Sequence, residues 1–260
     1  YVATSIWYLL LPLWITFLVM LDCIFGQVKV LRMQHRLEQF QKDFTYAMIH
    51  DMKSPLNSIL MAAHVLAGGK LADKPEKEEK YRRVMTEESE HLLALSNRVL
   101  MLTQLDEGHL ELHKEEVSLR PLLNDLIAKI SLKANKKVEF NTVYHRCETV
   151  YADAFCLREV LGNLLDNAIK YSDAGTVISV EEFSYELFSG IRITDQGVGI
   201  AEEEIPLLFG RFYRGKTVHD KEGIGVGLYL AREIVEHNGG YIKVKSEVLK
   251  GSTFDICFPR

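Results

Sequence analysis

The chain opens with an uncharged apolar stretch that runs from Tyr1 to Leu21. A helix of this length spans about 31 Å, which matches the hydrocarbon thickness of a bilayer. Lys29, Arg32 and Arg36 follow closely, and the positive-inside rule then predicts that the remainder of the chain lies in the cytoplasm. A buried core helix and a signal peptide are the alternatives, but the basic segment and small-residue cleavage site of a signal peptide are not visible. We therefore expect a transmembrane helix here.

Two segments with helical periodicity come next, because their apolar residues recur at intervals of three and four. The first covers residues 27–67 and the second about 76–106, and Gly68, Gly69 and Pro75 mark the connection between them. Two helices joined by so short a loop form an antiparallel hairpin. Its apolar face is too wide for the hairpin to cover alone, so we expect a dimeric four-helix bundle.

From about residue 117 the pattern changes to alternating strand and helix signals. The expected strands, rich in β-branched and aromatic residues, cover residues 138–143, 177–185, 187–194, 241–246 and 253–258. The expected helices cover residues 119–134, 155–171 and 226–238. Strands and helices do not alternate strictly, which favours an α/β two-layer sandwich with helices on one face of a sheet.

The composition changes this picture little. With 47% apolar and 26% charged residues, the chain can bury a core, which excludes a disordered protein. The net charge of −5 argues against a nucleic-acid binder that depends on bulk positive charge. Four separated cysteines without a CxxC pair indicate neither a zinc site nor a disulfide framework, and they fit a reducing compartment. Because the chain starts at Tyr1 rather than Met, we expect it to be a fragment of a longer protein.

His50 is the first candidate for chemistry. It lies about 200° around the helix from Met48, and therefore away from the apolar stripe. An exposed imidazole is largely neutral at pH 7 and can act as a nucleophile, while the adjacent Asp51 can accept its proton. Pro55 removes one backbone hydrogen bond and predicts a kink just after His50. A surface histidine beside an acid is more often only solvated, so the kink is what favours a functional site here.

The helix expected at 155–171 has two different faces. One is apolar, with Leu157, Leu161, Leu164 and Ala168. The opposite face carries Glu159, Asn163, Asn167 and Lys170. Asparagine is a poor helix former on a solvated face, whereas its amide oxygen suits Mg²⁺ when phosphates supply the other ligands. Polar decoration of the surface is the alternative.

Glycines then recur at two places. Asp195, Gly197 and Gly199 follow an expected strand, and this DxGxG pattern alone is often only a turn. Gly223, Gly225 and Gly227 open the last helix, where free backbone N–H groups can cradle phosphate. Neither the dinucleotide-binding fingerprint nor the P-loop has this spacing. The segment 209–222, basic at Arg211, Arg214 and Lys216, reads as a lid over phosphates.

In this order, these elements resemble a sensor histidine kinase of two-component systems over residues 40–260. The matching motifs are the H box at His50, Asp51, Ser54 and Pro55, the N box at Asn163, Asn167, Lys170 and Tyr171, the DxGxG box at Asp195, Gly197 and Gly199, the F box at Phe209, Phe212 and Arg214, and the second glycine box at Gly223, Gly225 and Gly227. The resemblance implies a phosphoacceptor hairpin in a homodimer, joined to a Bergerat-type (GHKL) ATP-binding domain. The chain would then consist of a transmembrane helix at 1–26, a signalling helix linker at 27–40, the hairpin at 41–112 and the catalytic domain at 113–260.

The family's chemistry then assigns roles by position. His50 would attack the γ-phosphate of Mg²⁺-ATP with Asp51 as its base, and an Asp of a response regulator would be the final acceptor. Asn167 would ligate Mg²⁺ with Asn163 nearby, while Lys170 and Arg214 would stabilise phosphate charge. Tyr171 would pack near the adenine, and Asp195 would bind its amine. The protein would sit in the bacterial inner membrane, with its catalytic part in the cytoplasm.

Two positions depart from the family pattern. Ser54 replaces the Thr or Asn that is common four residues after the histidine, which weakens the expectation of phosphatase activity. Gly210 stands where a longer side chain is usual in the F box. The short stretch between the apolar segment and His50 leaves no room for a HAMP relay, so we expect direct helical coupling. An ATPase of the chaperone or mismatch-repair type, or a catalytically dead membrane scaffold, is the competing interpretation.

Overall fold

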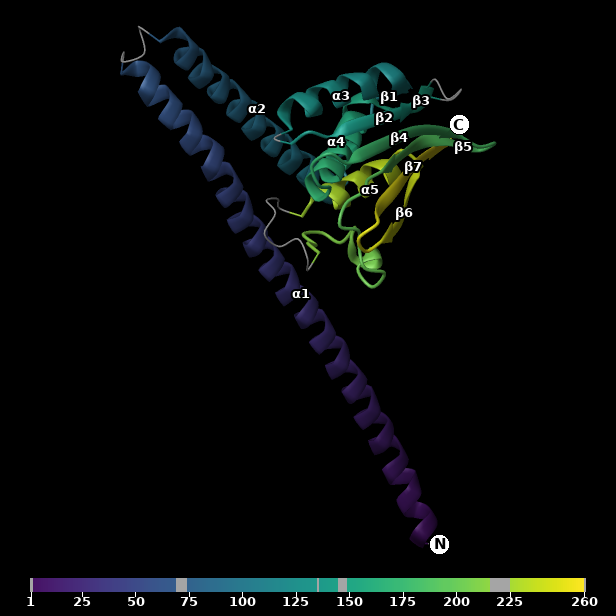
Figure 1. Ribbon diagram of the computed structural model, residues 1–260. Coiled ribbons are helices and arrows are strands. Elements are labelled where there is room, and N and C mark those ends of the chain that lie inside the picture. Colours follow the sequence, from purple (N-terminus) through teal and green to yellow (C-terminus); the bar gives the residue numbers. More distant parts are fainter. Residues whose placement is uncertain (1, 69–73, 135, 145–148, 216–224, 260) are drawn as a thin grey trace. The chain divides into compact units, whose positions relative to one another are not determined.

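A computed structural model describes residues 2–68, 74–134, 136–144, 149–215 and 225–259 (Figure 1). It describes the side chains of these residues except at positions 2–13, 36–41, 43, 44, 47 and 133. The chain divides into two compact units, Tyr1–His50 and Asp51–Arg260.

The first unit contains the N-terminal part of the helix α1 (Val2–Ala67). The remainder of α1 belongs to the second unit. The expected transmembrane and signalling helices are therefore one helix, without a break between residues 21 and 27. Within it, Trp14–His35 has a mean hydropathy of 1.7 and is long and apolar enough to cross a membrane, and none of this window is buried. The predicted span at 1–21 overlaps this window only in part, because the side chains before Trp14 lie outside the described ones.

Helix α1 also runs without interruption through Pro55. Proline removes one backbone donor from a helix, but this loss is not enough to end α1, and Pro55 is buried. The kink expected just after His50 stays a prediction.

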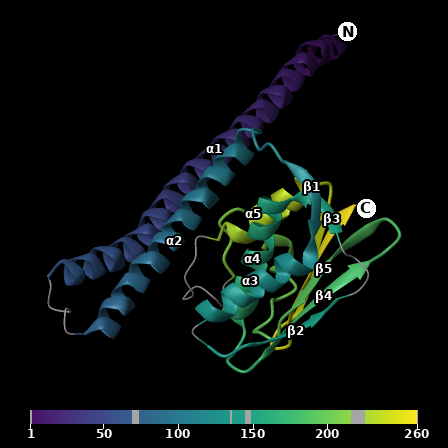
Figure 2. The ribbon, with the colours of Figure 1, turned by 90° about the horizontal axis from the view of Figure 1, so that it is seen from above.

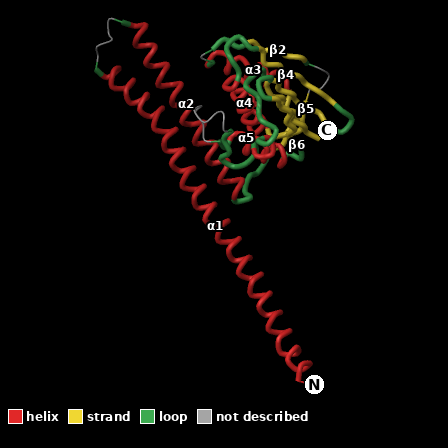
Figure 3. Tube along the Cα trace, turned by 60° about the horizontal axis from the view of Figure 1, so that its bottom comes forward, coloured by secondary structure: helices red, strands yellow, loops and turns green. Residues whose placement is uncertain are grey.

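The second unit begins with the end of α1 and with α2 (Pro75–Asp106), which form the predicted helical hairpin (Figure 3). Pro75 suits the first helical position, and Glu76 and Glu78 in the first turn complement the positive end of the helix dipole. Ala62 and Leu95 are buried in the hairpin. Several large apolar side chains remain more than half exposed: Leu56, Leu60, Met61, Leu93 and Leu100. This uncovered apolar surface agrees with the wide apolar face that the sequence pattern predicts for the hairpin.

The rest of the second unit, the α/β region from residue 113 onward, is the predicted two-layer sandwich (Figure 2). Its five-stranded sheet has the order β2-β4-β5-β7-β6. The strands are β2 (Glu139–Val143), β4 (Val177–Ser184), β5 (Phe188–Thr194), β6 (Tyr241–Glu247) and β7 (Gly251–Pro259). Strand β2 pairs with β4 in parallel, and the other pairs are antiparallel. The helices α3 (Leu119–Lys133), α4 (Ala154–Tyr171) and α5 (Gly227–His237) cover one face (Figure 2).

Two further strands were not expected from the sequence. They are β1 (Lys114–Ser118) and β3 (Thr149–Asp153), which pair antiparallel as a separate two-stranded sheet. Strand β1 reads KEEVS, and only Val117 in it is buried. A strand with a single buried side chain has almost no alternating apolar pattern, which explains why the sequence did not predict it.

The core lies between the helices and the inner face of the sheet. The predicted apolar face of α4 is confirmed as buried: Leu157, Leu161, Leu164 and Ala168 are each 3% exposed or less. Strands β4, β5 and β7 supply the facing residues Ile178, Val180, Ile191, Ile193 and Ile256, all 0–1% exposed. Burying one such side chain is worth about 1.5–3 kcal/mol, so this layer holds α4 firmly on the sheet.

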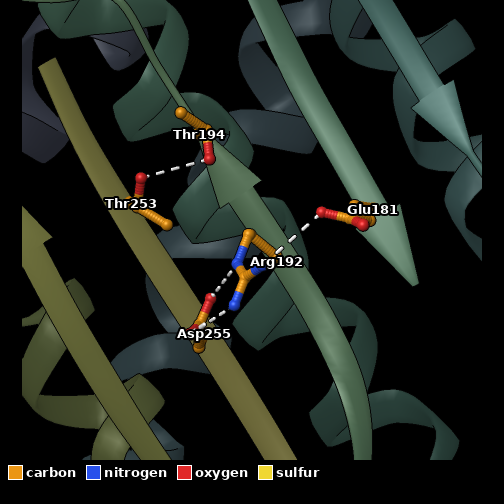
Figure 4. Close-up of polar contacts among 5 residues, drawn as sticks. All are labelled: Glu181, Arg192, Thr194, Thr253 and Asp255. Atoms are coloured by element: carbon orange, nitrogen blue, oxygen red, sulfur yellow. Dashed lines mark hydrogen bonds and ion pairs between the residues drawn. The ribbon is translucent and has the colours of Figure 1, made fainter. Parts of the chain in front are cut away.

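The opposite face of the sheet is held together by a charged cluster. Arg192 on β5 donates to Asp255 on β7 through Nε (2.7 Å) and Nη2 (3.0 Å), and its Nη1 lies 3.6 Å from Glu181 on β4 (Figure 4). Beside it, the hydroxyls of Thr194 and Thr253 lie 3.2 Å apart (Figure 4). These contacts tie three neighbouring strands together through side chains as well as backbone.

Candidate active site

Helix α4 positions the polar residues, and Asp153 sets where it begins. Asp153 Oδ1 accepts a hydrogen bond from the N–H of Cys156 (2.9 Å), and its Oδ2 accepts one from the N–H of His113 (2.9 Å). Burial alone would raise the pKa of the Asp153 carboxyl, but these hydrogen bonds outweigh it, so the pKa is lowered. The ionised carboxylate is therefore an effective N-cap.

Asn163 on α4 faces the start of α5. A Cβ atom built on Gly227 would lie 2.2 Å from Asn163 Oδ1 and 2.8 Å from its Nδ2. No residue other than glycine fits at position 227 without displacing the Asn163 amide. Asn163 Nδ2 is buried and has no hydrogen-bond partner among the described residues. A buried donor without a partner is costly in a folded protein, so this amide is arranged for a ligand or a bound water.

Asp195 follows strand β5 and is 7% exposed. Its Oδ1 accepts hydrogen bonds from the N–H groups of Gly197 (2.8 Å) and Ser252 (3.2 Å). Burial raises the pKa of the Asp195 carboxyl, and these two bonds oppose the shift. Because both bonds engage Oδ1, Oδ2 is the carboxylate oxygen that can accept a ligand's N–H group.

The segment after Asp195 packs tightly against the end of α4. The N–H of Val198 donates to the carbonyl of Tyr171 (3.2 Å), and a Cβ atom on Gly197 would lie 2.4 Å from that same oxygen. Gly199 has a φ of +68°, and a Cβ atom there would lie 2.0 Å from the carbonyl oxygen of Glu247. The glycines therefore allow a close approach of backbones that no other residue permits. This brings Asp195 and Tyr171 into one site.

Tyr171 and Lys170 close the carboxyl end of α4. Burial raises the pKa of the Tyr171 hydroxyl, and the positive charge of Arg214 opposes the shift. Lys170 Nζ lies 5.3 Å from the centre of the Tyr171 ring. Lys170 and Arg214 thus place two positive charges around the ring of Tyr171, where a ligand's negative charges would be stabilised.

The segment before α5 adopts an unusual backbone. Phe212 has a φ of +65°, and Gly225 has a φ of +75°. A Cβ atom on Gly225 would lie 2.9 Å from the carbonyl oxygen of Tyr213, so the chain on either side of residues 216–224 comes close together. Gly223 and Lys216 lie outside the described residues.

His50, Asp51 and Ser54 lie on α1. His50 ends the first unit and is exposed, as the sequence pattern predicted. Ser54 is also exposed, and its carbonyl accepts a hydrogen bond from the Ser58 hydroxyl (3.3 Å). The assignment of these three residues to the phosphoacceptor site stays a prediction.

Sequence reasoning missed two contributions to this site. Ser252 supplies one of the two N–H donors that hold Asp195, and its carbonyl accepts the N–H of Asp195 (2.9 Å). Gly251 has a φ of +110°, and a Cβ atom there would lie 2.0 Å from the Asp195 carbonyl oxygen. The Gly-Ser pair was visible in the sequence only as a turn, because nothing in it indicates which strand will lie alongside.

Comparison with known proteins decides the family. Residues 40–108 match the family model of the His Kinase A (phospho-acceptor) domain, and residues 152–260 match that of the histidine kinase-, DNA gyrase B- and HSP90-like ATPase. The chain belongs to the sensor histidine kinases of two-component systems. The two matched ranges agree with the helical hairpin and with the α/β region in which the site lies.

The relatives of this sensor histidine kinase include the sensor protein SrrB of Staphylococcus aureus, which is 31% identical over 231 residues. That match covers 87% of this chain and 39% of SrrB, so the chain spans well under half the length of these relatives. Among solved structures, the Acinetobacter baumannii histidine kinase AdeS matches with a TM-score of 0.55, 22% identity, and coverage of 81% of this chain and 97% of that one. Full-length ShkA in complex with AMPPNP matches with a TM-score of 0.58, 23% identity, and coverage of 84% and 45%. These two structures support the fold.

Proposed function

We propose that this sensor histidine kinase uses ATP to phosphorylate His50 and then passes the phosphoryl group to an Asp of a response regulator. The observation that carries the proposal is the meeting of Asn163 on α4 with Gly227 at the start of α5, together with the contact between the end of α4 at Tyr171 and the segment that follows Asp195. The buried Asn163 amide has an N–H group without a partner among the described residues, the start of α5 carries glycine, and one carboxylate oxygen of Asp195 accepts no hydrogen bond from the neighbouring N–H groups. Together these groups suit a purine nucleoside triphosphate. The family of the chain supports the same activity.

In this proposal, the protein binds the two ends of ATP through different groups. Oδ2 of Asp195 accepts the exocyclic amine of adenine, and the ring of Tyr171 packs near the base. Gly197 and Gly199 let the backbone approach the nucleotide closely. The N–H groups at Gly225 and Gly227, together with Gly223, hold the phosphates at the start of α5.

The phosphates also need positive charge. Lys170 and Arg214 supply it, because phosphoryl transfer depends mainly on positioning and electrostatic stabilisation. Asn167 would ligate Mg²⁺ through its amide oxygen, with Asn163 close by. Mg²⁺ would neutralise phosphate charge when bound. The donor set fits this ion, because an amide oxygen is a hard donor of the kind that Mg²⁺ accepts, and phosphate oxygens would complete the coordination.

The chemical step at His50 follows from its exposure on α1. A neutral ring nitrogen attacks the γ-phosphorus, an N–P bond forms, and the bond from that phosphorus to the β–γ bridging oxygen breaks to release ADP. Asp51 accepts the proton that the imidazole loses. Ser54 keeps a hydroxyl near the phosphoacceptor and could support a weak phosphatase activity.

The proposal extends to the assembly and its location. The exposed apolar residues of the hairpin support a homodimer, with boundaries at 41–112 for the hairpin and 113–260 for the catalytic domain. The window Trp14–His35 supports anchoring of α1 in the bacterial inner membrane, with the catalytic part in the cytoplasm. Residues 1–26 would then span the bilayer, and residues 27–40 would carry the signal directly to the hairpin.

The test is to incubate the chain with γ-labelled ATP and to examine the stability of the product. We expect a label that alkali leaves intact and acid removes, as a phosphohistidine requires. His50→Gln should lose this label while still binding ATP. Retained label on His50→Gln would overturn the assignment of the phosphoacceptor, and ATP binding without any such label on the unaltered chain would overturn the proposed activity.

A further inference from the structure

The last residue of α2 forms an ion pair with the segment that precedes α5. Arg211 Nη2 lies 2.5 Å from Asp106 Oδ2, a charge-assisted hydrogen bond between residues 105 positions apart in the sequence. Neither residue has a role in the nucleotide site proposed above. The pair therefore needs a separate explanation.

Arg211 is held in place by more than this one contact. Its guanidinium lies 5.4 Å from the centre of the Tyr229 ring and 5.5 Å from that of Phe212. Its Nε is buried and has no hydrogen-bond partner among the described residues. Tyr229 belongs to the first turn of α5, two residues after Gly227. Arg211 thus connects the start of α5 to the end of α2.

A second ion pair links the same two parts of the molecule. Arg98 Nε on α2 lies 3.8 Å from Glu159 Oε2 on α4, the helix that carries Asn163 and Asn167. In one pair α2 supplies the negative charge, Asp106, and in the other it supplies the positive charge, Arg98. Both residues lie in the C-terminal third of α2. The contact between the hairpin and the α/β region is therefore electrostatic at both of these points.

The position of Asp106 along the hairpin indicates what the pair does. Helix α2 rises about 46 Å from Pro75 to Asp106, whereas Asp51 lies about 24 Å before the end of α1. In an antiparallel hairpin, Asp106 is therefore about 20 Å further from the connecting loop than Asp51. A segment bound to Asp106 is therefore held about 20 Å along the hairpin from the position of Asp51, the neighbour of the proposed phosphoacceptor.

We infer that the Asp106–Arg211 ion pair is a latch that restrains phosphoryl transfer, with Arg211 as a residue that positions the α/β region against the end of α2. While the pair is intact, the α/β region is held at the end of α2. Release of the pair frees that region to approach His50. This inference rests on the proposed function, because it concerns the regulation of the same site.

The test compares Asp106→Asn with a matched control, Glu107→Gln, in the full chain. Glu107 is the adjacent carboxylate, and its Oε2 lies 3.4 Å from His109 Nδ1. Because the ion pair is partly exposed, we expect Asp106→Asn to raise the initial rate of His50 phosphorylation about two- to fivefold. Glu107→Gln should leave the rate unchanged. The affinity for a nonhydrolysable ATP analogue should be the same in all three proteins.

Two further measurements distinguish a latch from a general change in stability. The charge-reversed double variant Asp106→Arg/Arg211→Asp should return the rate toward that of the unaltered chain. Rising salt concentration should accelerate the unaltered chain but not Asp106→Asn, because salt screens partly exposed pairs. Equal rates for Asp106→Asn and Glu107→Gln, or a lower rate for Asp106→Asn that the double variant restores, would overturn the latch. If the unaltered chain never phosphorylates His50, it is the proposed function that fails.

Discussion

The amide of Asn163 and the bare Cα of Gly227 lie so close that a single added methyl group would come within 2.2 Å of the amide oxygen. Real Cβ atoms do not approach other atoms this closely, so the side chain or the helix start would have to move. The two residues come from different helices, α4 and α5, and the strands β4 and β5 lie between these helices in the chain. Their contact joins the expected metal-binding face to the expected phosphate-binding helix start.

Gly227→Ala tests this contact. The new methyl group would displace Asn163 and the N–H groups around it, and we expect nucleotide affinity to fall about tenfold or more. Titration with a fluorescent ATP analogue would measure the change.

Gly162→Ala on α4, at the position next to Asn163, provides the control. A Cβ atom there would lie 3.9 Å from a Leu126 methyl, which is an ordinary contact. Because alanine favours a helix over glycine by up to about 1 kcal/mol, this variant should keep its affinity and raise the melting temperature. If both variants bind ATP equally well, the Asn163–Gly227 contact is irrelevant to the site.

Asn167→Ala tests the proposed magnesium ligand. Removal of its amide oxygen should weaken the Mg²⁺-dependent part of nucleotide binding about 10- to 100-fold. The measurement compares titrations in Mg²⁺ with titrations in a chelator. Asn141→Ala, the same substitution on the exposed strand β2, should change neither titration. Unchanged Mg²⁺ dependence in Asn167→Ala would remove this residue from the metal site.

Asp255→Asn tests the charged cluster on the outer face of the sheet. It replaces the carboxylate that accepts two hydrogen bonds from Arg192, and we expect a loss of about 1 kcal/mol in the free energy of unfolding. Glu181→Gln alters the longer 3.6 Å contact of the same arginine and should cost less. Denaturant unfolding checks both, and ATP affinity should stay the same. A larger loss for Glu181→Gln would show that we have ranked the two contacts wrongly.

The N-cap Asp153 makes stability depend on pH. Its folded pKa lies below the unfolded value of about 3.9. Its contribution is therefore present above that unfolded value and is lost as the pH falls through the folded pKa. Unfolding free energies measured between pH 5 and pH 3 should fall more steeply for the unaltered chain than for Asp153→Asn. Parallel curves would mean that the hydrogen bonds to Cys156 and His113 do not depend on the charge of Asp153.

The elements with strong periodicity were predicted well, and those without it were missed. Helix α4 was predicted to within a residue, because Leu157, Leu161 and Leu164 mark its buried face. Strand β1 was missed, because its only buried side chain is Val117. The membrane segment expected at 1–26 and the signalling linker expected at 27–40 both lie on the single helix α1.

The candidate site divides in the same way. The sequence singled out Asn163 and Asn167 because asparagine is unusual on a solvated helix face, and it singled out Asp195 through the DxGxG pattern. Ser252 and the Asp106–Arg211 pair were not found, since each depends on a partner more than 50 positions away.

The amino-acid order alone determined the apolar N-terminal stretch, the hairpin, the order of the sandwich elements and the motifs that indicate a histidine kinase. Local spacing is enough for these features, because helices and strands repeat with fixed periods. Only the tertiary structure decided that Gly227 leaves room for Asn163, that Ser252 holds Asp195, and that Arg211 reaches Asp106. These relationships arise from close packing between distant segments, and no period within the chain encodes them.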